Sequence, residues 1–379
     1  MYDLIVIGGG PAGSAAAIAA ARAGAQVLLL ERGRYPRHKV CGEFVSAESL
    51  DLLSTLLGTH DKALLNQAIP ISHTRLFVDD RVIEIPITPA AASIARFDLD
   101  ATLWHAAQNC GVEAHQQTTV QRFSGDGPFS VSTSLGEFDA RALINTSGRW
   151  SNLTAPLKEN GNIRDKWVGL KAHFAESAPS QSVDLYFFKG GYCGVQPARL
   201  LGADQSADPK NGDQNTIDRD KDRINVCAMV RVDTASTLLD VFWQNLQLRE
   251  RSGNWQPLTE PVTTSPLFFR PPRPVQGTVL MAGDAAGFVD PFVGDGISLA
   301  LRSSALAAKS LQPFFRGENS LGKAADSYRK AYEHTLQPVF RASSRIRRML
   351  ALPQALRGLL LSFLQSSPGL TRYLVHQTR

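Results

Sequence analysis

A glycine-rich turn near the start of the chain constrains the fold more than any other feature. An apolar run at residues 3–7 leads into the sequence GGGPAG (residues 8–13), which opens an alanine-rich stretch that ends near Arg22. A second apolar run at 26–30 closes on Glu31, 18 residues after the last glycine of the turn. The pattern predicts a β-strand, a tight turn, a helix and a second strand that ends in an acid.

The three spaced glycines of this turn have separate physical roles. Gly8 permits the tight turn, Gly10 lets the backbone approach a pyrophosphate, and Gly13 lets the helix pack closely against the strand. Unpaired N–H groups at the helix N-terminus attract phosphate, and Glu31 can accept a hydrogen bond from a ribose hydroxyl. Because a glutamate at this position disfavours a 2′-phosphate, the pattern predicts FAD or NAD rather than NADP.

A second glycine-rich segment lies in the last third of the chain. A predicted buried strand at 278–282 ends in Gly283 and Asp284, and the sequence DPFVGDG (residues 290–296) then opens a helical stretch. The segment offers a carboxylate and a helix N-terminus about ten residues apart. Two such elements suit a long dinucleotide that contains a polyol, which favours FAD.

The cysteines and histidines of the chain show no metal-binding spacing. The four cysteines are 69, 83 and 34 residues apart, so no two of them form a CxxC pair or a zinc knuckle. No HxxxH or HxH pair is present, and we expect no metal site. Widely spaced cysteines are typical of a reducing, cytoplasmic compartment.

The net charge of +5 is concentrated at the C-terminal end of the chain. Residues 334–379 contain seven arginines and no acids, so the rest of the chain carries a net charge of −2. A nearly neutral body without a basic, aromatic-rich face argues against nucleic acid as a partner. An acid stands near the N-terminus where a signal peptide needs basic residues, and no run of about 18 uncharged apolar residues occurs, so we expect neither a secretory segment nor a membrane span.

The middle of the chain has a different pattern. Residues 167–231 contain runs of alternating polar and apolar residues, which predict an antiparallel sheet. Residues 203–222 have Ile217 as their one large apolar residue, and we interpret them as a solvated hairpin insertion, with a catalytic lid as the alternative.

Four motifs distributed over residues 2–300 resemble those of a flavoprotein superfamily. They are GGGPAG with Glu31, PRHKVCG at 36–42, Arg96 ahead of Asp100, and Gly283-Asp284 followed by Pro-x-x-Gly-x-Gly. The superfamily contains aromatic hydroxylases such as p-hydroxybenzoate hydroxylase, flavin-dependent halogenases and geranylgeranyl reductases. PRxKxCG is a feature of the geranylgeranyl reductase-like subgroup, which the chain resembles most.

The resemblance implies that the chain binds FAD, and it assigns residues to the parts of the cofactor. The GGGPAG turn would hold the pyrophosphate, Glu31 the adenosine ribose, and Asp284 the ribityl or pyrophosphate portion. The turn at 291–296 would face the flavin N1–C2=O edge, where a helix N-terminus stabilises the negative charge of reduced flavin. The full set of expected cofactor contacts is Gly8, Gly10, Pro11, Ala12, Gly13, Glu31, Arg32, Lys39, Cys41, Gly42, Arg96, Gly283, Asp284, Pro291, Gly294, Asp295 and Gly296.

The chain also departs from the superfamily pattern. Ser147 stands where the hydroxylases carry the aspartate of an Asp-Gly pair that handles nicotinamide. Because no second GxGxxG module exists, we expect NAD(P)H to bind transiently near the flavin, or another carrier to supply the electrons. The reductase signature YxWxFP is matched only in part at 192–197, and the halogenase signature WxWxIP is absent, which makes halogenation the least favoured of the three reactions.

Cys41 and Tyr192 are the candidate catalytic residues. Cys41 follows Arg37 and Lys39, whose charges would favour a thiolate. The alternative is a small buried residue that packs near the flavin ring. Tyr192 would donate a hydrogen bond to the substrate, although a strand tyrosine is more often a core residue.

The C-terminal segment from 336 to 379 combines arginines with apolar clusters such as 349–352 and 359–364. We expect helices broken at Pro353 and Pro368 that cap the substrate cavity. The alternative is a helix lying on an anionic membrane surface, which would give peripheral membrane contact and suit a lipid substrate.

These observations predict an α/β enzyme that acts on a hydrophobic small molecule. The expected reaction is C=C reduction of an isoprenoid-like chain, with flavin-dependent hydroxylation of an aromatic, polyketide or lipid substrate as the alternative. A prenyl-binding carrier similar to the Rab GDP-dissociation inhibitors is a rival without catalysis. The expected parts are a discontinuous, Rossmann-like (GR2-type) FAD-binding domain at 1–75, 96–165 and 266–330, an antiparallel β-sheet substrate domain at 76–95 and 166–265, and a helical C-terminal segment at 331–379.

Overall fold

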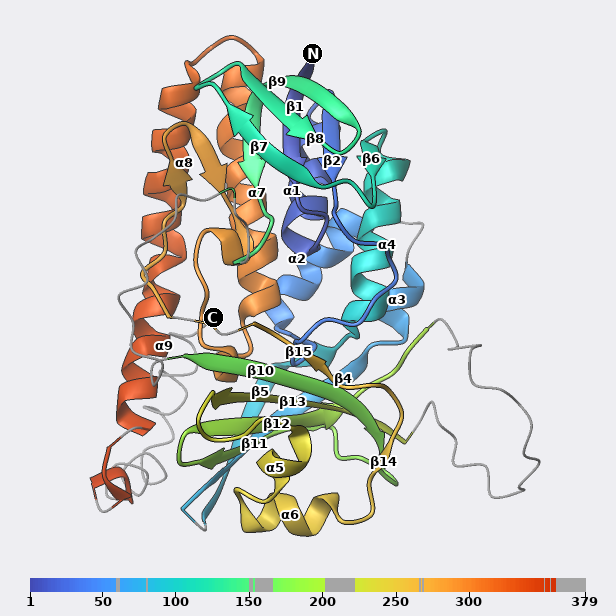
Figure 1. The fold of residues 1–379 in the computed structure, drawn as a ribbon, viewed down its shortest axis with the longest axis vertical. Helices are drawn as coiled ribbons and strands as arrows, with labels where there is room; N and C mark the ends of the chain where they lie inside the picture. Colours follow the sequence, from blue (N-terminus) through green and yellow to red (C-terminus); the bar gives the residue numbers. More distant parts are fainter. Residues whose placement is uncertain are drawn as a thin grey trace, which may run out of the picture.

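The computed structural model describes residues 1–58, 62–79, 81–149, 153, 166–201, 222–265, 267, 269–350, 352–354 and 356–358 (Figure 1). Within these residues the chain forms two β-sheets, one above the other in Figure 1, with helices around the upper sheet. The expected insertion at 203–222 lies outside the described residues except for Asp222, and the apolar cluster at 359–364 lies outside them entirely.

The first sheet contains the predicted strand, turn, helix and strand. Its strands are β1 (Tyr2–Ile7), β2 (Val27–Leu30), β6 (Glu113–His115), β7 (Val120–Ser124), β8 (Phe129–Thr133), β9 (Gly136–Asn145), β16 (Val275–Gln276) and β17 (Val279–Met281). Their order is β16-β17-β9-β1-β2-β6, with all neighbours parallel except β16 and β17, and β7 and β8 continue from β9 as antiparallel strands. The carboxyl ends of the parallel strands therefore meet at one edge.

The described helices lie mostly around this sheet, and two short ones, at 238–242 and 246–252, pack on the second sheet. They are α1 (Pro11–Arg22), α2 (Ala47–Leu57), α3 (Lys62–Asn66), α4 (Arg96–Asn109), α5 (Leu238–Phe242), α6 (Leu246–Ser252), α7 (Gly296–Phe315), α8 (Leu321–Thr335) and α9 (Gln337–Leu350), with short 3-10 turns η2 (Gly283–Ala285) and η3 (Pro291–Val293). No helix among the described residues is long and apolar enough to cross a membrane.

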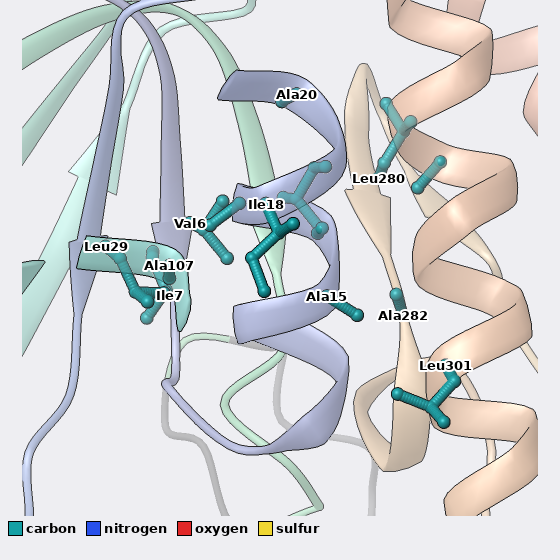
Figure 2. Packing of buried hydrophobic residues seen from close by; sticks show 14 of the residues in the cluster. Val6, Ile7, Ala15, Ile18, Ala20, Leu29, Ala107, Leu280, Ala282 and Leu301 are labelled. Atoms are coloured by element: carbon teal, nitrogen blue, oxygen red, sulfur yellow. The ribbon is translucent and has the colours of Figure 1, made fainter. Parts of the chain in front are cut away.

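The core of this part lies between β1 and the helices. Residues 4–7 of β1 and all of β2 are buried, as expected for parallel strands covered on both faces. Figure 2 shows Ile18 of α1 beside Val6, with Leu280 and Leu301 on the other side of the helix. The small alanine side chains of α1 let the helix pack closely against α4 and α7, which fixes its position over the sheet.

The second sheet is mostly antiparallel. Its strands are β3 (Phe44–Val45), β4 (Ile69–Val78), β5 (Arg81–Ser93), β10 (Trp167–Ala175), β11 (Ser182–Phe188), β12 (Gly191–Pro197), β13 (Arg223–Arg231), β14 (Gln256–Pro257) and β15 (Val262–Thr263). The order is β14-β10-β13-β12-β11-β4-β5-β3, β15 also pairs with β10, and β11 pairs with β4 in parallel. The chain enters this sheet first at β3 and again at β4, which begins at Ile69, so both strands precede residue 76, where the substrate domain was expected to start.

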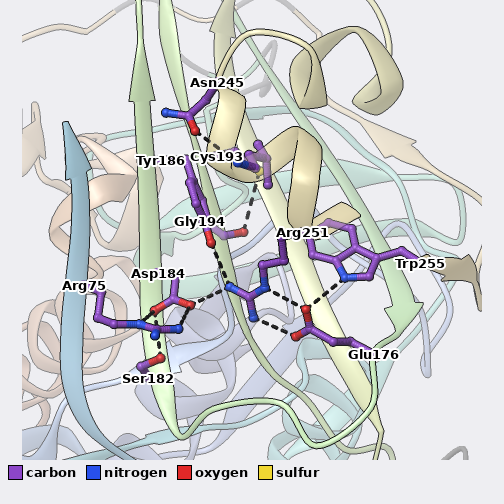
Figure 3. A network of polar contacts seen from close by, with 11 residues as sticks. Arg75, Glu176, Ser182, Asp184, Tyr186, Cys193, Gly194, Asn245, Arg251 and Trp255 are labelled. Atoms are coloured by element: carbon purple, nitrogen blue, oxygen red, sulfur yellow. Dashed lines mark hydrogen bonds and ion pairs between the residues drawn. The ribbon is translucent and has the colours of Figure 1, made fainter. Parts of the chain in front are cut away.

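An ionic network at the outer end of the second sheet fastens α6 to the strands (Figure 3). Arg251 of α6 donates to both carboxylate oxygens of Glu176 at 2.7 Å and to the hydroxyl of Tyr186 at 3.0 Å, and it also pairs with Asp184. Arg75 of β4 pairs with the same Asp184 from the other side. The two cations neutralise a carboxylate that is 1% exposed, which stabilises this end of the sheet.

Candidate functional site

The glycines of the first turn differ in what requires them. Gly8 has a φ of +102°, and a Cβ on Gly13 would lie 1.7 Å from the carbonyl oxygen of Gly8, so packing within the protein excludes side chains at both positions. Gly10 has an ordinary φ of −69°, and the nearest atom to a Cβ there is Nη2 of Arg96 at 3.8 Å. Nothing in the protein requires a glycine at position 10, but a bound group beside it would.

The space beside Gly10 suits a pyrophosphate. Gly10 is the N-cap of α1 and has no side chain that could cap the first N–H groups of the helix, which leaves these groups available to an anion. Arg96 begins α4, and its guanidinium lies between Gly10 and the buried Asp100, to which it donates at 2.6 and 2.7 Å. Burial lowers the pKa of Lys39, and the positive charges of Arg37 and Arg96 lower it further. The N-terminus of α1 and the guanidinium of Arg96 suit a phosphate group, and the contacts of FAD here stay a prediction.

Glu31 is buried at the end of β2 and orders the glycine turn. Its carboxylate accepts hydrogen bonds from the N–H of Gly9 at 2.8 Å, from the N–H of Gly33 at 2.7 Å and from Arg37 at 2.7 Å. Burial opposes ionisation, but the charge of Arg37 and the N–H donors hold the pKa of Glu31 below its usual value. The neighbouring Arg32 is exposed.

The second glycine-rich segment lies at the same edge of the first sheet. Asp284 follows β17, and its carboxylate is 3.4 Å from Nη2 of Arg149. Asn145, at the end of β9, is fully buried and accepts a hydrogen bond from the N–H of Ser147 at 3.0 Å. Its Nδ2 has no hydrogen-bond partner among the described residues, which leaves a buried donor for a polar group of the cofactor. Sequence reasoning missed Asn145 and Arg149.

The predicted turn before α7 packs against the segment that contains the PRxKxCG motif. Gly294 has a φ of +75°, and a Cβ there would lie 2.9 Å from the ring of Phe44. Asp295 is the N-cap of α7, and Gly296, its first residue, has open space where a Cβ would project. The open space at Gly296 would accept a flat ring system beside the N-terminus of α7. Contact between this turn and the flavin stays a prediction.

A pocket lies between this turn and the inner face of the second sheet. It brings together five predicted site residues, Cys41, Gly42, Tyr192, Pro291 and Gly294. The remaining predicted residues, which include Gly8, Gly10, Gly13, Glu31, Asp284 and Arg96, do not line it. Most of the other side chains that line the pocket are apolar, among them Val40, Phe44, Val183, Leu185, Met229 and Phe292.

Tyr192 is engaged within the protein. Its hydroxyl donates to Oδ1 of Asp290 at 3.2 Å, and both side chains are buried. Burial raises the pKa of Tyr192 well above its usual value, and the negative charge of Asp290 adds to the effect. The predicted donation from Tyr192 to substrate would therefore compete with Asp290.

Asp290 connects the pocket to α9. Burial raises the pKa of Asp290 to about 6, against the opposing charge of Arg347, which lies 3.7 Å away. The guanidinium of Arg347 lies over the ring of Phe269 at 4.0 Å, and Phe269 stacks on Phe288 with 5.4 Å between ring centroids. Arg149 lies over the opposite ring, Phe288, at 3.7 Å. This four-layer stack joins α9 to the edge of the first sheet.

Cys41 is half-buried, and its sulfur accepts a hydrogen bond from the N–H of Glu43 at 3.3 Å. Arg37, one of the two cations expected to favour its thiolate, is directed at Glu31 instead. Glu43 itself is fully buried and pairs with Lys171 and His173 of β10. The sequence signal for this cluster was available, since lysine and histidine two residues apart in a strand share one face. Among the described residues, no group of three or more His, Cys, Asp or Glu side chains is arranged to hold a metal ion.

Comparisons with known proteins agree with FAD as the cofactor. Residues 3–47 match the family model for FAD dependent oxidoreductases. The chain is 24% identical to a flavin-dependent halogenase of Armillaria mellea, over 83% of this chain and 68% of the relative. It is 26% identical to a menaquinone reductase of Mycobacterium tuberculosis (82% and 76%) and 24% identical to a digeranylgeranylglycerophospholipid reductase of Methanothermobacter thermautotrophicus (81% and 76%).

Solved structures share the whole fold. The flavin-dependent brominase Bmp2 matches with a TM-score of 0.78 at 18% identity, over 100% of this chain and 93% of the brominase. A geranylgeranyl bacteriochlorophyll reductase-like protein from Thermoplasma acidophilum matches with a TM-score of 0.73 at 18% identity, over 94% and 90%. These matches confirm the predicted α/β fold class. The family match over residues 3–47 and the reductase and halogenase relatives, each 24–26% identical to the chain, support an FAD-dependent enzyme.

Proposed function

We propose that the chain reduces an isolated C=C bond in an isoprenoid-like chain, with NAD(P)H as the transient electron donor. The observation that carries this proposal is that the pocket lining is mostly apolar and that two of its polar side chains, Gln196 and Tyr192, already have partners within the protein. Gln196 donates to Ser93 at 2.7 Å, and Tyr192 donates to Asp290. A hydrocarbon chain needs no hydrogen-bond partners, so it fits this lining better than a phenol does.

FAD, when bound, supplies the hydride for such a reduction. The other carbon of the double bond needs a proton, and the thiol of Cys41 at the pocket wall would supply it. Burial raises the pKa of Cys227, the other thiol in the pocket wall, to about 12. The apolar side chains of Val183, Leu185 and Phe292 would orient the chain and exclude water.

The domain roles and the role of α9 belong to the same proposal. The first sheet would bind FAD and the second sheet would bind the substrate, with the sequence boundaries given above. Helix α9 would cap the pocket, which the contacts of Arg347 with Asp290 and Phe269 support. The enzyme would work in the cytoplasm, and contact with a membrane surface would be limited to delivery of substrate.

The experiment uses the purified holoenzyme, an isoprenoid alcohol with isolated double bonds, and NAD(P)H, under nitrogen and under air. Cys41→Ser should reduce product formation by about 10²-fold, the usual effect of losing a general acid, while FAD stays bound and is reduced at the parent rate. Cys110→Ser is the matched control, because Cys110 is also a half-buried free cysteine but does not line the pocket.

Two results would contradict the proposal. Product that forms only in air and contains added oxygen would identify a hydroxylase. Anaerobic product from Cys41→Ser at the parent rate would show that the thiol supplies no proton.

A further inference from the structure

A buried ionic cluster lies beside the pocket, outside its lining. The carboxylate of Glu43 is 0% exposed, and it pairs with Nζ of Lys171 and with Nε2 of His173 at 3.1 Å. It also accepts a hydrogen bond from the backbone N–H of Arg96 at 3.1 Å. The donors come from two parts of the fold, since Lys171 and His173 lie on β10 of the second sheet and Arg96 begins α4 beside the first sheet.

Glu43 is an unusual residue to find at this point. Its φ is +63°, a left-handed conformation that non-glycine side chains rarely adopt. Both its charge and that of Lys171, which is 1% exposed, are removed from water, and such a pair seldom stabilises a fold more than apolar residues of the same size would. Strain and buried charge at one residue point to a functional constraint on its position.

The cluster holds the pocket cysteine in place. The N–H of Glu43 donates to Sγ of Cys41, and Nδ2 of Asn225 donates to the carbonyl oxygen of Cys41 at 3.1 Å. Asn225 lies directly opposite His173 in the pairing of β10 with β13, and Cys227, which lines the pocket, lies opposite Lys171. The strand face that binds Glu43 is therefore continuous with the strand face that lines the pocket.

The cluster also reaches the predicted pyrophosphate turn. Arg96 donates its backbone N–H to Glu43, and its guanidinium is the nearest group to the open space at Gly10. Burial opposes ionisation of Glu43, but the charge of Lys171 and the hydrogen bonds keep its pKa well below the usual value. The carboxylate therefore keeps its charge and its three donors across the physiological pH range.

We propose that Glu43 is a positioning residue, which fixes the Cys41 thiol against the pocket and the N-terminus of α4 against the cofactor turn through one carboxylate. The role does not depend on which reaction the enzyme performs. Loss of the carboxylate should change two properties together, namely the position of the Cys41 thiol and the affinity for FAD.

The test compares Glu43→Gln with Glu176→Gln in the full-length protein. Glu176 is a matched control, because it is a carboxylate just beyond the end of the same strand β10, it also has three donor contacts, from Arg251 and Trp255, and it belongs to the remote network of Figure 3. The first measurement is the alkylation rate of Cys41 by iodoacetamide, followed on the Cys41 peptide at a pH high enough to ionise exposed thiols. The second is the dissociation constant of FAD from flavin fluorescence.

Glu43→Gln should raise the alkylation rate of Cys41 at least tenfold, because the segment loses its anchor, and should weaken FAD binding at least tenfold. Glu176→Gln should lower the unfolding temperature but change both measurements less than twofold. Should Glu43→Gln leave an unpaired lysine that prevents folding, the double variant Glu43→Gln/Lys171→Met removes both charges and is expected to show the same two changes. Alkylation and FAD binding within twofold of the parent in whichever of these variants folds would overturn the proposal, and so would failure of both to fold, since the cluster would then serve the fold itself.

Discussion

A valine at position 10 is expected to separate cofactor binding from folding. The backbone of Gly10 has φ −69° and ψ −172°, which any residue adopts, and no protein atom lies closer than 3.8 Å to the Cβ position. Gly10→Val should therefore fold, with a change in the free energy of unfolding of up to about 1 kcal/mol from the poorer N-cap. The branched side chain would fill the space that the pyrophosphate needs.

The neighbouring Gly13 gives the contrast. An added Cβ at that position would lie 1.7 Å from the carbonyl oxygen of Gly8 and 2.9 Å from its carbonyl carbon, and these are backbone atoms that cannot rotate away. Gly13→Ala should destabilise the protein by at least the upper end of the range of about 1–3 kcal/mol that overpacking costs. The two substitutions, three residues apart, thus predict opposite defects.

Thermal unfolding with and without added FAD, together with the visible absorbance of the purified proteins, distinguishes them. At a free FAD concentration 100 times the dissociation constant, binding stabilises the parent by about 2.7 kcal/mol, and Gly10→Val should lose this gain while matching the parent without FAD. Gly13→Ala should be the less stable protein before any FAD is added. A yellow Gly10→Val protein with one flavin per chain would refute the reasoning.

Three further outcomes are expected. Burial raises the pKa of Asp290 from 3.8 to about 6, so the native state binds this proton more tightly than the unfolded chain does. The free energy of unfolding should therefore fall by about 3 kcal/mol as the pH rises from 4 to 6. Chemical unfolding at several pH values should show this decrease in the parent and not in Asp290→Asn. Arg251→Met should lower the free energy of unfolding by about 3 kcal/mol, the lower end for a broken buried ion pair, because Arg75 stays paired with Asp184. The FAD dissociation constant should stay unchanged, and altered flavin binding would show that the network of Figure 3 reaches the site. If α9 caps the pocket, sedimentation with anionic vesicles should leave the protein in solution, and binding that weakens with salt would support the membrane alternative instead.

The first sheet was easier to predict than the second. The residues that its strands and turns need locally are also the residues that its parallel topology needs. A parallel strand buried on both faces gives the continuous apolar run of β1, and the turn after it needs glycines for reasons of packing that hold without a ligand. Motif spacing thus predicted both glycine-rich segments, and the parallel pairing of β9 and β17 brings the second one to the edge where the first one lies.

The second sheet could be predicted in kind but not in detail. Alternating residues indicate which strands have two different faces, yet they do not say which strand lies beside which, so the parallel pair of β4 and β11 was not foreseen. The position of Glu43 in the cluster was hidden for a similar reason. Its partners Lys171 and His173 lie more than a hundred residues away in the sequence, and they meet Glu43 only because β10 packs beside the segment that follows PRxKxCG.

The segment that carries PRxKxCG explains why the two halves of the site are coupled. Arg37 pairs with Glu31 of the first sheet, Val40 packs on Gly169 of β10, and Glu43 pairs with Lys171 in the second sheet. A chain held at three points over seven residues has little freedom to move at one end alone. The thiol of Cys41 lies between the last two of these contacts, so a change at Glu31, in the predicted ribose and pyrophosphate region, would reach the pocket through the backbone itself, without movement of either sheet.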